Sequence, residues 1–172
     1  MKKFIKLDPK TVDMNPFSTL DDNWMLITAR SGEKVNTMTA SWGGLGVLWN
    51  KNVAYVFVRP QRYTRELIDE SDHFSLNILD HETYRKELEY LGKASGRDED
   101  KIAKSKLTLA YSNEVPYFQE ADQVLICRKL SRQQITKDSF IEAGLAAKNY
   151  PTDDFHYVYV GEIEDFLVKE EI

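Results

Sequence analysis

Hydrophobic residues in this chain fall into short runs of strand length, separated by polar, turn-forming residues. Residues 24–29 and 35–41 are both rich in β-prone side chains, and Ser31–Lys34 between them supplies turn chemistry. This spacing predicts a β-hairpin. Residues 53–58 form an unbroken apolar run that ends before Pro60, as expected for a strand covered on both faces.

Two segments carry helical periodicity instead. Tyr63–Glu70 is typical of a short helix, and Thr64 is placed to cap its first turn. Tyr84, Leu88 and Leu91 stand at i, i+4 and i+7, which predicts a second helix with one apolar face.

Strands dominate both ends of the chain. Residues 73–79, 124–135 and 156–163 each favour a strand, whereas the glycines within 43–46 predict a flexible connection. Few helices lie between the strands, and the early strands are joined by short turns, so an antiparallel barrel is favoured over a parallel doubly wound sheet. The expected class is mainly β with helices (α+β).

Length and composition limit the possibilities further. At roughly 150 residues per domain, 172 residues predict a single domain over 1–172. A hydrophobic fraction of 42% and a charged fraction of 30% exclude a disordered chain and a coiled coil. The formal net charge of −5 has the wrong sign for a nucleic-acid or anionic-membrane surface, so neither is expected as a partner.

The location is expected to be cytoplasmic. The start of the chain lacks an apolar signal-peptide core, and no run of about eighteen apolar residues occurs, so neither a signal peptide nor a membrane span is predicted. Cys127 is the single cysteine and cannot form an internal disulfide, which favours a reducing compartment.

No familiar catalytic or metal-binding motif is present. His73, His81 and His156 are far apart in sequence, and Cys127 lies in a predicted strand, so neither a metal site nor a Cys-His nucleophile is supported. The glycines within 43–46 lack the GxGxxG spacing of a dinucleotide fold, and no phosphate-binding P-loop occurs.

Three polar segments interrupt the hydrophobic pattern, at 36–43, 59–64 and 92–98. Small hydroxyl residues and glycines in the first would let a flat ring approach the backbone, although alternating threonines are also ordinary in strands. Arginines at a strand-to-helix junction in the second would attract a phosphate, although a capped, solvated turn has the same composition. The third could contribute to the same anion site or be a helix end followed by a charged loop.

Together these segments give the chain a resemblance to a known family. It resembles the flavin reductase-like, FMN-binding split-barrel family, in particular its small flavoredoxin-like bacterial members. The motifs that carry the resemblance are NTMTASW at 36–42, RPQRYT at 59–64, HFSLNIL at 73–79, GKASGRD at 92–98 and YVYVGEI at 157–163. Residues 107–155 match only loosely.

The resemblance implies a six-stranded antiparallel Greek-key split β-barrel. It also implies a homodimer, with FMN in a groove near the subunit interface. The residues that would contact FMN are Thr37, Met38, Thr39, Ala40, Ser41 and Trp42 along the ring, Arg59, Gln61, Arg62, Tyr63 and Thr64 at the phosphate or ribityl chain, and Lys93, Ser95 and Gly96 closing around it.

Two functions from different classes follow. The first is an NAD(P)H-dependent oxidoreductase that passes electrons through bound FMN to a free flavin or small acceptor, with NADH or NADPH as donor. The second is a non-catalytic FMN-binding electron carrier that serves a redox partner protein, for which the acidic composition suits docking onto a basic surface. A pyridoxamine-phosphate-oxidase-like member of the same architecture ranks below both. No catalytic side chain is identified, because the flavin itself would carry the chemistry.

Overall fold

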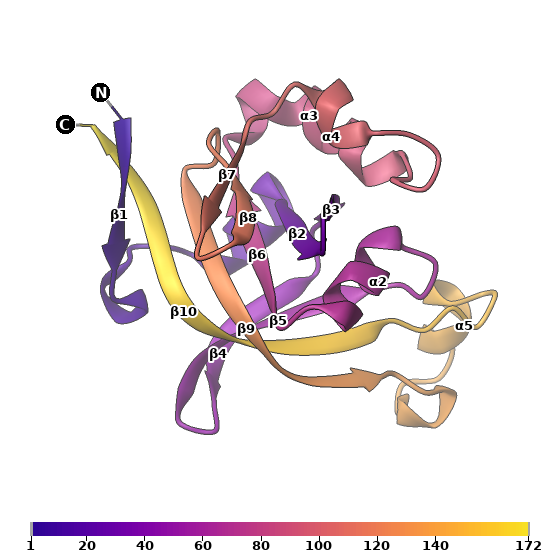
Figure 1. Ribbon diagram of the computed structural model, residues 1–172. Coiled ribbons are helices and arrows are strands. Elements are labelled where there is room, and N and C mark those ends of the chain that lie inside the picture. Colours follow the sequence, from indigo (N-terminus) through magenta and orange to yellow (C-terminus); the bar gives the residue numbers. More distant parts are fainter. Residues whose placement is uncertain (1, 172) are drawn as a thin grey trace.

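The computed structural model describes residues 2–171, and most of its strands belong to one antiparallel sheet (Figure 1). The strand order is β3-β2-β6-β9-β10-β5-β4, and β1 pairs with β10 beside this path. The strands are β1 (Lys2–Leu7), β2 (Met25–Ser31), β3 (Lys34–Ala40), β4 (Gly43–Leu48), β5 (Lys51–Val58), β6 (His73–Ile78), β9 (Gln123–Gln134) and β10 (Tyr157–Glu171).

Five helices and a separate hairpin complete the described part of the fold. The hairpin consists of β7 (Leu109–Ser112) and β8 (Val115–Phe118). The helices are α1 (Pro16–Ser18), α2 (Tyr63–Glu70), α3 (His81–Lys93), α4 (Lys101–Ser105) and α5 (Leu145–Asn149), with further helical turns at Pro9–Thr11, Thr19–Asn23 and Lys137–Ser139. Within residues 2–171, no helix has the length and apolar character needed to cross a membrane.

The predicted class is confirmed, but the strand count is not. The main sheet has eight strands instead of six. Strand β10 is long enough to pair with β5 through residues 157–162 and with β1 through residues 166–171, so β1 is added at its far end. The predicted flexible connection at 43–46 is also wrong, because these glycines form β4 and pair with β5 from Val53 to Val56.

The predicted hairpin at 24–41 is confirmed as β2 and β3, with Gly32 at a φ of 57° in its turn. The predicted cap of α2 is wrong. The residue before that helix is Arg62, which makes no capping hydrogen bond, and the Thr64 hydroxyl accepts one from Asn36 Nδ2 at 2.9 Å instead.

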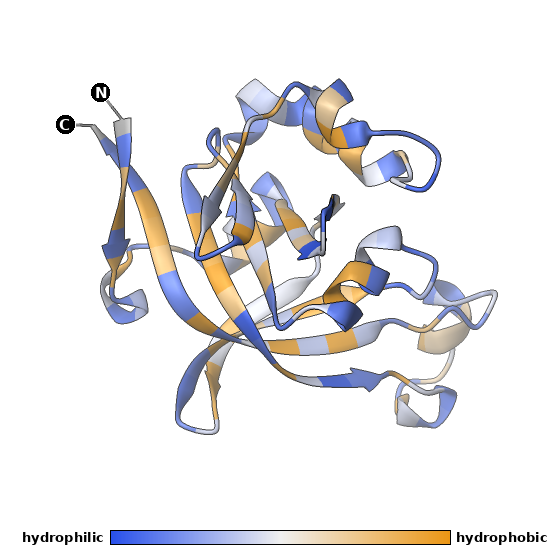
Figure 2. Cartoon of the chain, in the orientation of Figure 1, coloured by the Kyte–Doolittle hydropathy of each residue, from blue (hydrophilic) through white to orange (hydrophobic). Residues whose placement is uncertain are grey.

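Hydrophobic side chains fill two clusters. One is built around Ile27, Phe74 and Tyr159, and the other places Leu88 and Leu91 of α3 against Leu26 and other strand residues. Figure 2 shows both hydrophobic and polar positions along β10, and its Tyr159, Val160 and Phe166 are buried.

A buried polar network holds the strands in register. Thr28 and Thr37 face each other with their hydroxyls 2.8 Å apart, and Asn77 Nδ2 donates to the Thr28 hydroxyl at 3.2 Å. Asn77 Oδ1 accepts from the main chain of Phe118 at 2.9 Å, which ties the β7–β8 hairpin to β6. Each member is hydrogen-bonded, as burial in a core requires.

Candidate functional site

Strand β3 is an edge strand that runs between helices (Figure 1). It pairs with β2 on one side only, while α3 and α2 pack against it. Thr39 donates a hydrogen bond to the main-chain oxygen of Leu88 at 2.6 Å, and a methyl placed on Gly92 would stand 3.3 Å from Thr39 Cβ. The glycine therefore lets α3 approach the outer edge of the sheet closely.

A shallow depression follows β3 beyond this contact. We call it the β3 depression; it encloses about 240 Å³. Its lining residues are Trp24, Thr39, Ala40, Ser41, Leu88, Glu89, Gly92 and Lys93. Four of the residues predicted to bind a cofactor, Thr39, Ala40, Ser41 and Lys93, are thus brought together.

A larger recess, the apolar hollow, begins where the β3 depression ends. It encloses about 780 Å³ and shares Ser41 with that depression. Its lining residues are Pro16, Phe17, Leu20, Asp21, Ser41, Trp42, Gly43, Gly44, Leu45, Tyr55, Phe57, Ile135 and Tyr150. The predicted residue Trp42 lies here with its side chain half exposed.

Arg62 lies behind the β3 depression. Its Nη1 donates to the main-chain oxygen of Gly92 at 2.7 Å, whereas its Nη2 is buried and has no hydrogen-bond partner. Burial lowers the pKa of the Arg62 guanidinium. A buried donor without a partner is costly, which marks this nitrogen as a group that a bound anion would satisfy.

Lys101 is a second buried cation at the same helix end. Its Nζ donates to the main-chain oxygens of Leu91 and Ala94, each at 2.9 Å. Burial, followed by repulsion from Arg62, lowers the pKa of Lys101 to about 8. Cations at the carboxyl end of a helix are favoured by its dipole, so Lys101 and Arg62 hold the turn after α3 in place.

Arg59 and Gln61, which the resemblance also places at FMN, do not line the β3 depression and contact Asp154 instead. Arg59 Nη1 and Gln61 Nε2 both donate to Asp154 Oδ2, at 2.5 Å and 2.9 Å. The hydrogen bonds from Gln61 and Arg59 lower the pKa of Asp154 to about 2. Arg59 also lies 5.1 Å from the ring centroid of Tyr150, so its charge is already engaged within the chain.

Tyr150 and His156 form a buried pair behind Trp42. The Tyr150 hydroxyl and His156 Nδ1 are 2.8 Å apart, and the rings of His156 and Trp42 are 5.5 Å apart between centroids. Burial, followed by repulsion from Arg59, lowers the pKa of His156 to about 4. The imidazole is therefore neutral near pH 7 and supports the indole of Trp42 by packing.

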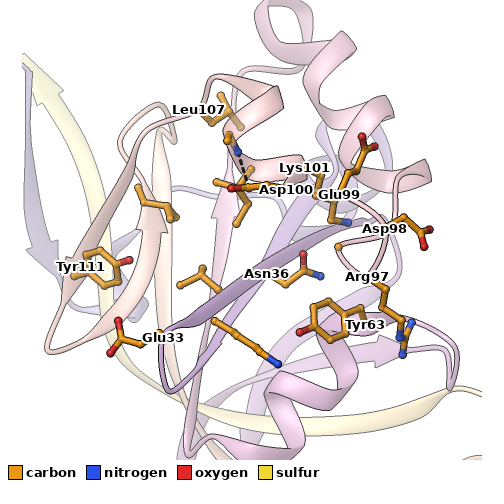
Figure 3. Close-up of a pocket in the computed structure, with 16 residues that line it drawn as sticks. Glu33, Asn36, Tyr63, Arg97, Asp98, Glu99, Asp100, Lys101, Leu107 and Tyr111 are labelled. Atoms are coloured by element: carbon orange, nitrogen blue, oxygen red, sulfur yellow. Dashed lines mark hydrogen bonds between the residues drawn. The ribbon is translucent and has the colours of Figure 1, made fainter.

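A third recess, the charged hollow, is drawn in Figure 3, and two of the residues predicted to bind FMN, Tyr63 and Gly96, line it. It encloses about 720 Å³, and Asn36, Tyr63 and Lys101 lie around it. Gly96 also lines it, and a Cβ there would come within 2.2 Å of Asn36 Oδ1. The turn around Gly96 is therefore packed directly on β3.

The remaining predicted residues do not face either recess along β3. Thr37 and Met38 are buried inside the sheet, where the Thr37 hydroxyl also bonds to the main-chain oxygen of Ile27 at 3.1 Å. Thr64 is buried against Asn36. The Ser95 hydroxyl accepts from the main-chain nitrogen of Arg97 at 3.2 Å, which stabilises its own turn.

Several residues of the site had no clear signal in the sequence. Lys101 follows the acidic run Asp98–Asp100, which indicates a solvated segment, yet its side chain is only 3% exposed. Tyr150 lies within residues 107–155, which match the family only loosely, and His156 begins the predicted strand 156–163, so nothing in the sequence indicates that the two side chains pair. Among residues 2–171, no group of three or more histidine, cysteine, aspartate or glutamate side chains is arranged to hold a metal ion.

Comparison with known proteins places this geometry in a family. The model of the flavin reductase like domain matches residues 17–172. No curated protein sequence matches the chain significantly.

Solved structures share the fold. An FMN-binding domain of a flavin reductases-like enzyme from Shewanella baltica superposes with a TM-score of 0.71 at 15% identity, covering 97% of this chain and 78% of the other. Flavoredoxin from Methanosarcina acetivorans gives 0.65 at 24% identity, covering 87% and 68%. The styrene monooxygenase flavin reductase from Pseudomonas putida gives 0.60 at 15% identity, covering 84% and 77%. With a family match that spans most of its length, the chain belongs to the flavin reductase like domain family.

Proposed function

We propose that this protein is an FMN-binding flavoprotein that acts as an NAD(P)H-dependent reductase, passing electrons through the flavin to a small acceptor. The observation that carries the proposal is the unpartnered Nη2 of Arg62. It lies behind Gly92, which lines the β3 depression together with the predicted ring-binding residues Thr39, Ala40 and Ser41.

The phosphate end of FMN fits the cationic groups at the end of α3. Arg62 and Lys101 make their hydrogen bonds to main-chain oxygens, so neither side chain has a carboxylate bonded to it. Lys93 adds an exposed ammonium group at the surface of the same turn. A dianionic phosphate here would balance these charges and supply an acceptor to Arg62 Nη2.

The ring end fits the free edge of β3. Because β3 pairs only with β2, its outward main-chain groups are available to the polar edge of a planar ring. Bound FMN would supply a group that accepts a hydride and releases electrons. The chain's own contribution is to bind and orient the ring along Thr39–Trp42 and to hold the phosphate turn through Arg62 and Lys101.

We also propose that the protein is a homodimer with FMN near the subunit interface. The β3 depression is smaller than the roughly 300–1,000 Å³ typical of small-molecule sites, so this chain alone would leave much of a bound ring uncovered. Val47 and Trp49, in and just after β4 at the other edge of the sheet, are 67% and 59% exposed and could take part in such an interface.

The alternative is an electron carrier that turns over no small molecule. Its support is the net charge of −5, which suits docking onto a basic redox partner, and the likeness to proteins named flavoredoxin.

One anaerobic titration tests the proposal and separates the two functions. The visible spectrum of purified protein supplemented with FMN is recorded, then NADH, NADPH and finally dithionite are added. Rapid bleaching by a nucleotide supports the reductase. Bleaching by dithionite alone supports the carrier, and failure to retain FMN after gel filtration overturns both.

A further inference from the structure

The apolar hollow is well formed, and apart from Ser41 and Trp42 its lining lies outside the residues that are proposed to hold FMN. We propose that it binds the electron acceptor and that this acceptor is a small, planar, uncharged molecule such as a quinone or an unphosphorylated aromatic ring. That the ligand accepts electrons rests on the proposed function, whereas its chemical class rests on the hollow itself.

Size and walls favour a flat organic molecule. The hollow encloses about 780 Å³, which lies within the range of small-molecule sites. Aromatic side chains from four separate segments line it, namely Phe17 of α1, Trp42, the β5 residues Tyr55 and Phe57, and Tyr150. Such rings offer large apolar faces for stacking.

The charge around the hollow argues against an anion. Among the described residues that line it, Asp21 is the only charged one. The nearby guanidinium of Arg59 is ion-paired with Asp154 and lies against the Tyr150 ring. A phosphate or sulfonate would enter an apolar recess beside a carboxylate with no free cation to meet it, which is unfavourable.

The position of the hollow suits electron transfer. It meets the β3 depression at Ser41, and Trp42 follows as the next residue. A planar molecule in the hollow would therefore lie at the end of the segment that is proposed to bind the flavin ring.

Glycine creates the open wall of the hollow and provides a matched pair of variants. Gly44 and Gly46 point to the same face of β4, and a Cβ would contact the Tyr55 ring at 3.6 Å and 3.8 Å, which is ordinary packing distance. Of these two glycines, Gly44 lines the apolar hollow and Gly46 does not. Valine is well tolerated in strands, so Gly44→Val narrows the hollow and Gly46→Val is its control.

The test is equilibrium dialysis with two probes of the same shape, 2-naphthol and naphthalene-2-sulfonate, on FMN-free and FMN-loaded protein. We expect 2-naphthol to bind at least tenfold more tightly than the sulfonate. Gly44→Val should weaken 2-naphthol binding at least tenfold, whereas Gly46→Val should leave it within twofold.

A charge exchange gives an independent arm. Asp21→Lys should improve sulfonate binding at least threefold, whereas Asp22→Lys, at an exposed neighbour that does not line the hollow, should not. Equal binding of the two probes, or equal losses in both glycine variants, would overturn the ligand class. Failure of the dimeric protein to bind 2-naphthol would also overturn the ligand class.

The same samples are titrated with FMN, which separates the two proposals. If the two probes bind as expected but FMN does not bind, the proposed function and the role of the ligand as electron acceptor are overturned. The chemical class of the ligand is not. FMN binding without the probe pattern would overturn this inference alone. In FMN-loaded protein, 2-naphthol should also compete with 2-methyl-1,4-naphthoquinone and not with NADH.

Discussion

Arg62 donates a hydrogen bond from Nη1 to the main-chain oxygen of Gly92 at 2.7 Å, and its other terminal nitrogen is buried without a partner. One arginine from the loop before α2 therefore fixes the end of α3 and still has an unused donor. This relationship links two segments that are thirty residues apart in the chain.

Replacing Arg62 should weaken FMN binding. Arg62→Ala removes a guanidinium from a partly buried site, and we expect a loss of about 1.5 to 3 kcal/mol, the usual scale of a charge-assisted hydrogen bond to an anion. A fluorescence titration with FMN measures the loss. Arg85→Ala, on the exposed face of α3, is the control. Unchanged affinity in the Arg62 variant would remove this residue from the site.

Much of the fold can be predicted from the sequence, because most of its strands and helices have a pattern within their own residues. The β2–β3 hairpin follows from two β-prone runs around Gly32, and α3 follows from the spacing of Leu88 and Leu91. Strand β1 could not be found in this way. It forms because Lys2–Leu7 pairs with residues 166–171 at the other end of the chain, and no local periodicity reports such a partner.

The site was only partly accessible for a similar reason. The resemblance implies that Thr37–Trp42 line the flavin ring, and that stays a prediction. In the structure Thr39–Trp42 line the two recesses whereas Thr37 is buried, and alternation alone does not distinguish these orientations. The burial of Lys101 could not be predicted from the sequence. The main-chain oxygens that accept its hydrogen bonds, those of Leu91 and Ala94, come together only at the end of α3.

Thr37 and Thr39 should respond differently to the same change. Thr37→Val leaves the buried Thr28 hydroxyl with one partner fewer and should lower the free energy of unfolding by about 1 to 3 kcal/mol. FMN affinity of the folded fraction should not change, since Thr37 faces away from the β3 depression. Thr39→Val alters that depression and should weaken FMN binding. Urea unfolding and FMN titration of both variants provide the comparison, and a reversed pattern would contradict the proposed placement.

His156 should make stability depend on pH on the acidic side. Burial and the charge of Arg59 lower its folded-state pKa to about 4, below the roughly 6.5 of an unfolded chain. Between these values the unfolded state binds more protons, so the free energy of unfolding should fall as pH decreases from about 6.5 to 4.

Urea unfolding at several pH values measures this slope. His156→Gln should reduce it, because this variant removes the imidazole whose pKa is lowered on folding. An unaltered slope in the His156 variant would assign the pH dependence to other groups.

Dimerisation should be coupled to flavin retention. The β3 depression covers too little volume to enclose a ring alone, so a second copy is expected to complete the site. Light scattering should show a dimer, and dilution to the monomer should release FMN. Val47→Glu places a charge on the exposed edge strand β4 and should shift the equilibrium toward monomer, whereas Tyr111→Glu, on the separate β7–β8 hairpin, should not. A monomer that retains FMN would show that one chain suffices, and the shallow depression would then have to close around the ring by itself.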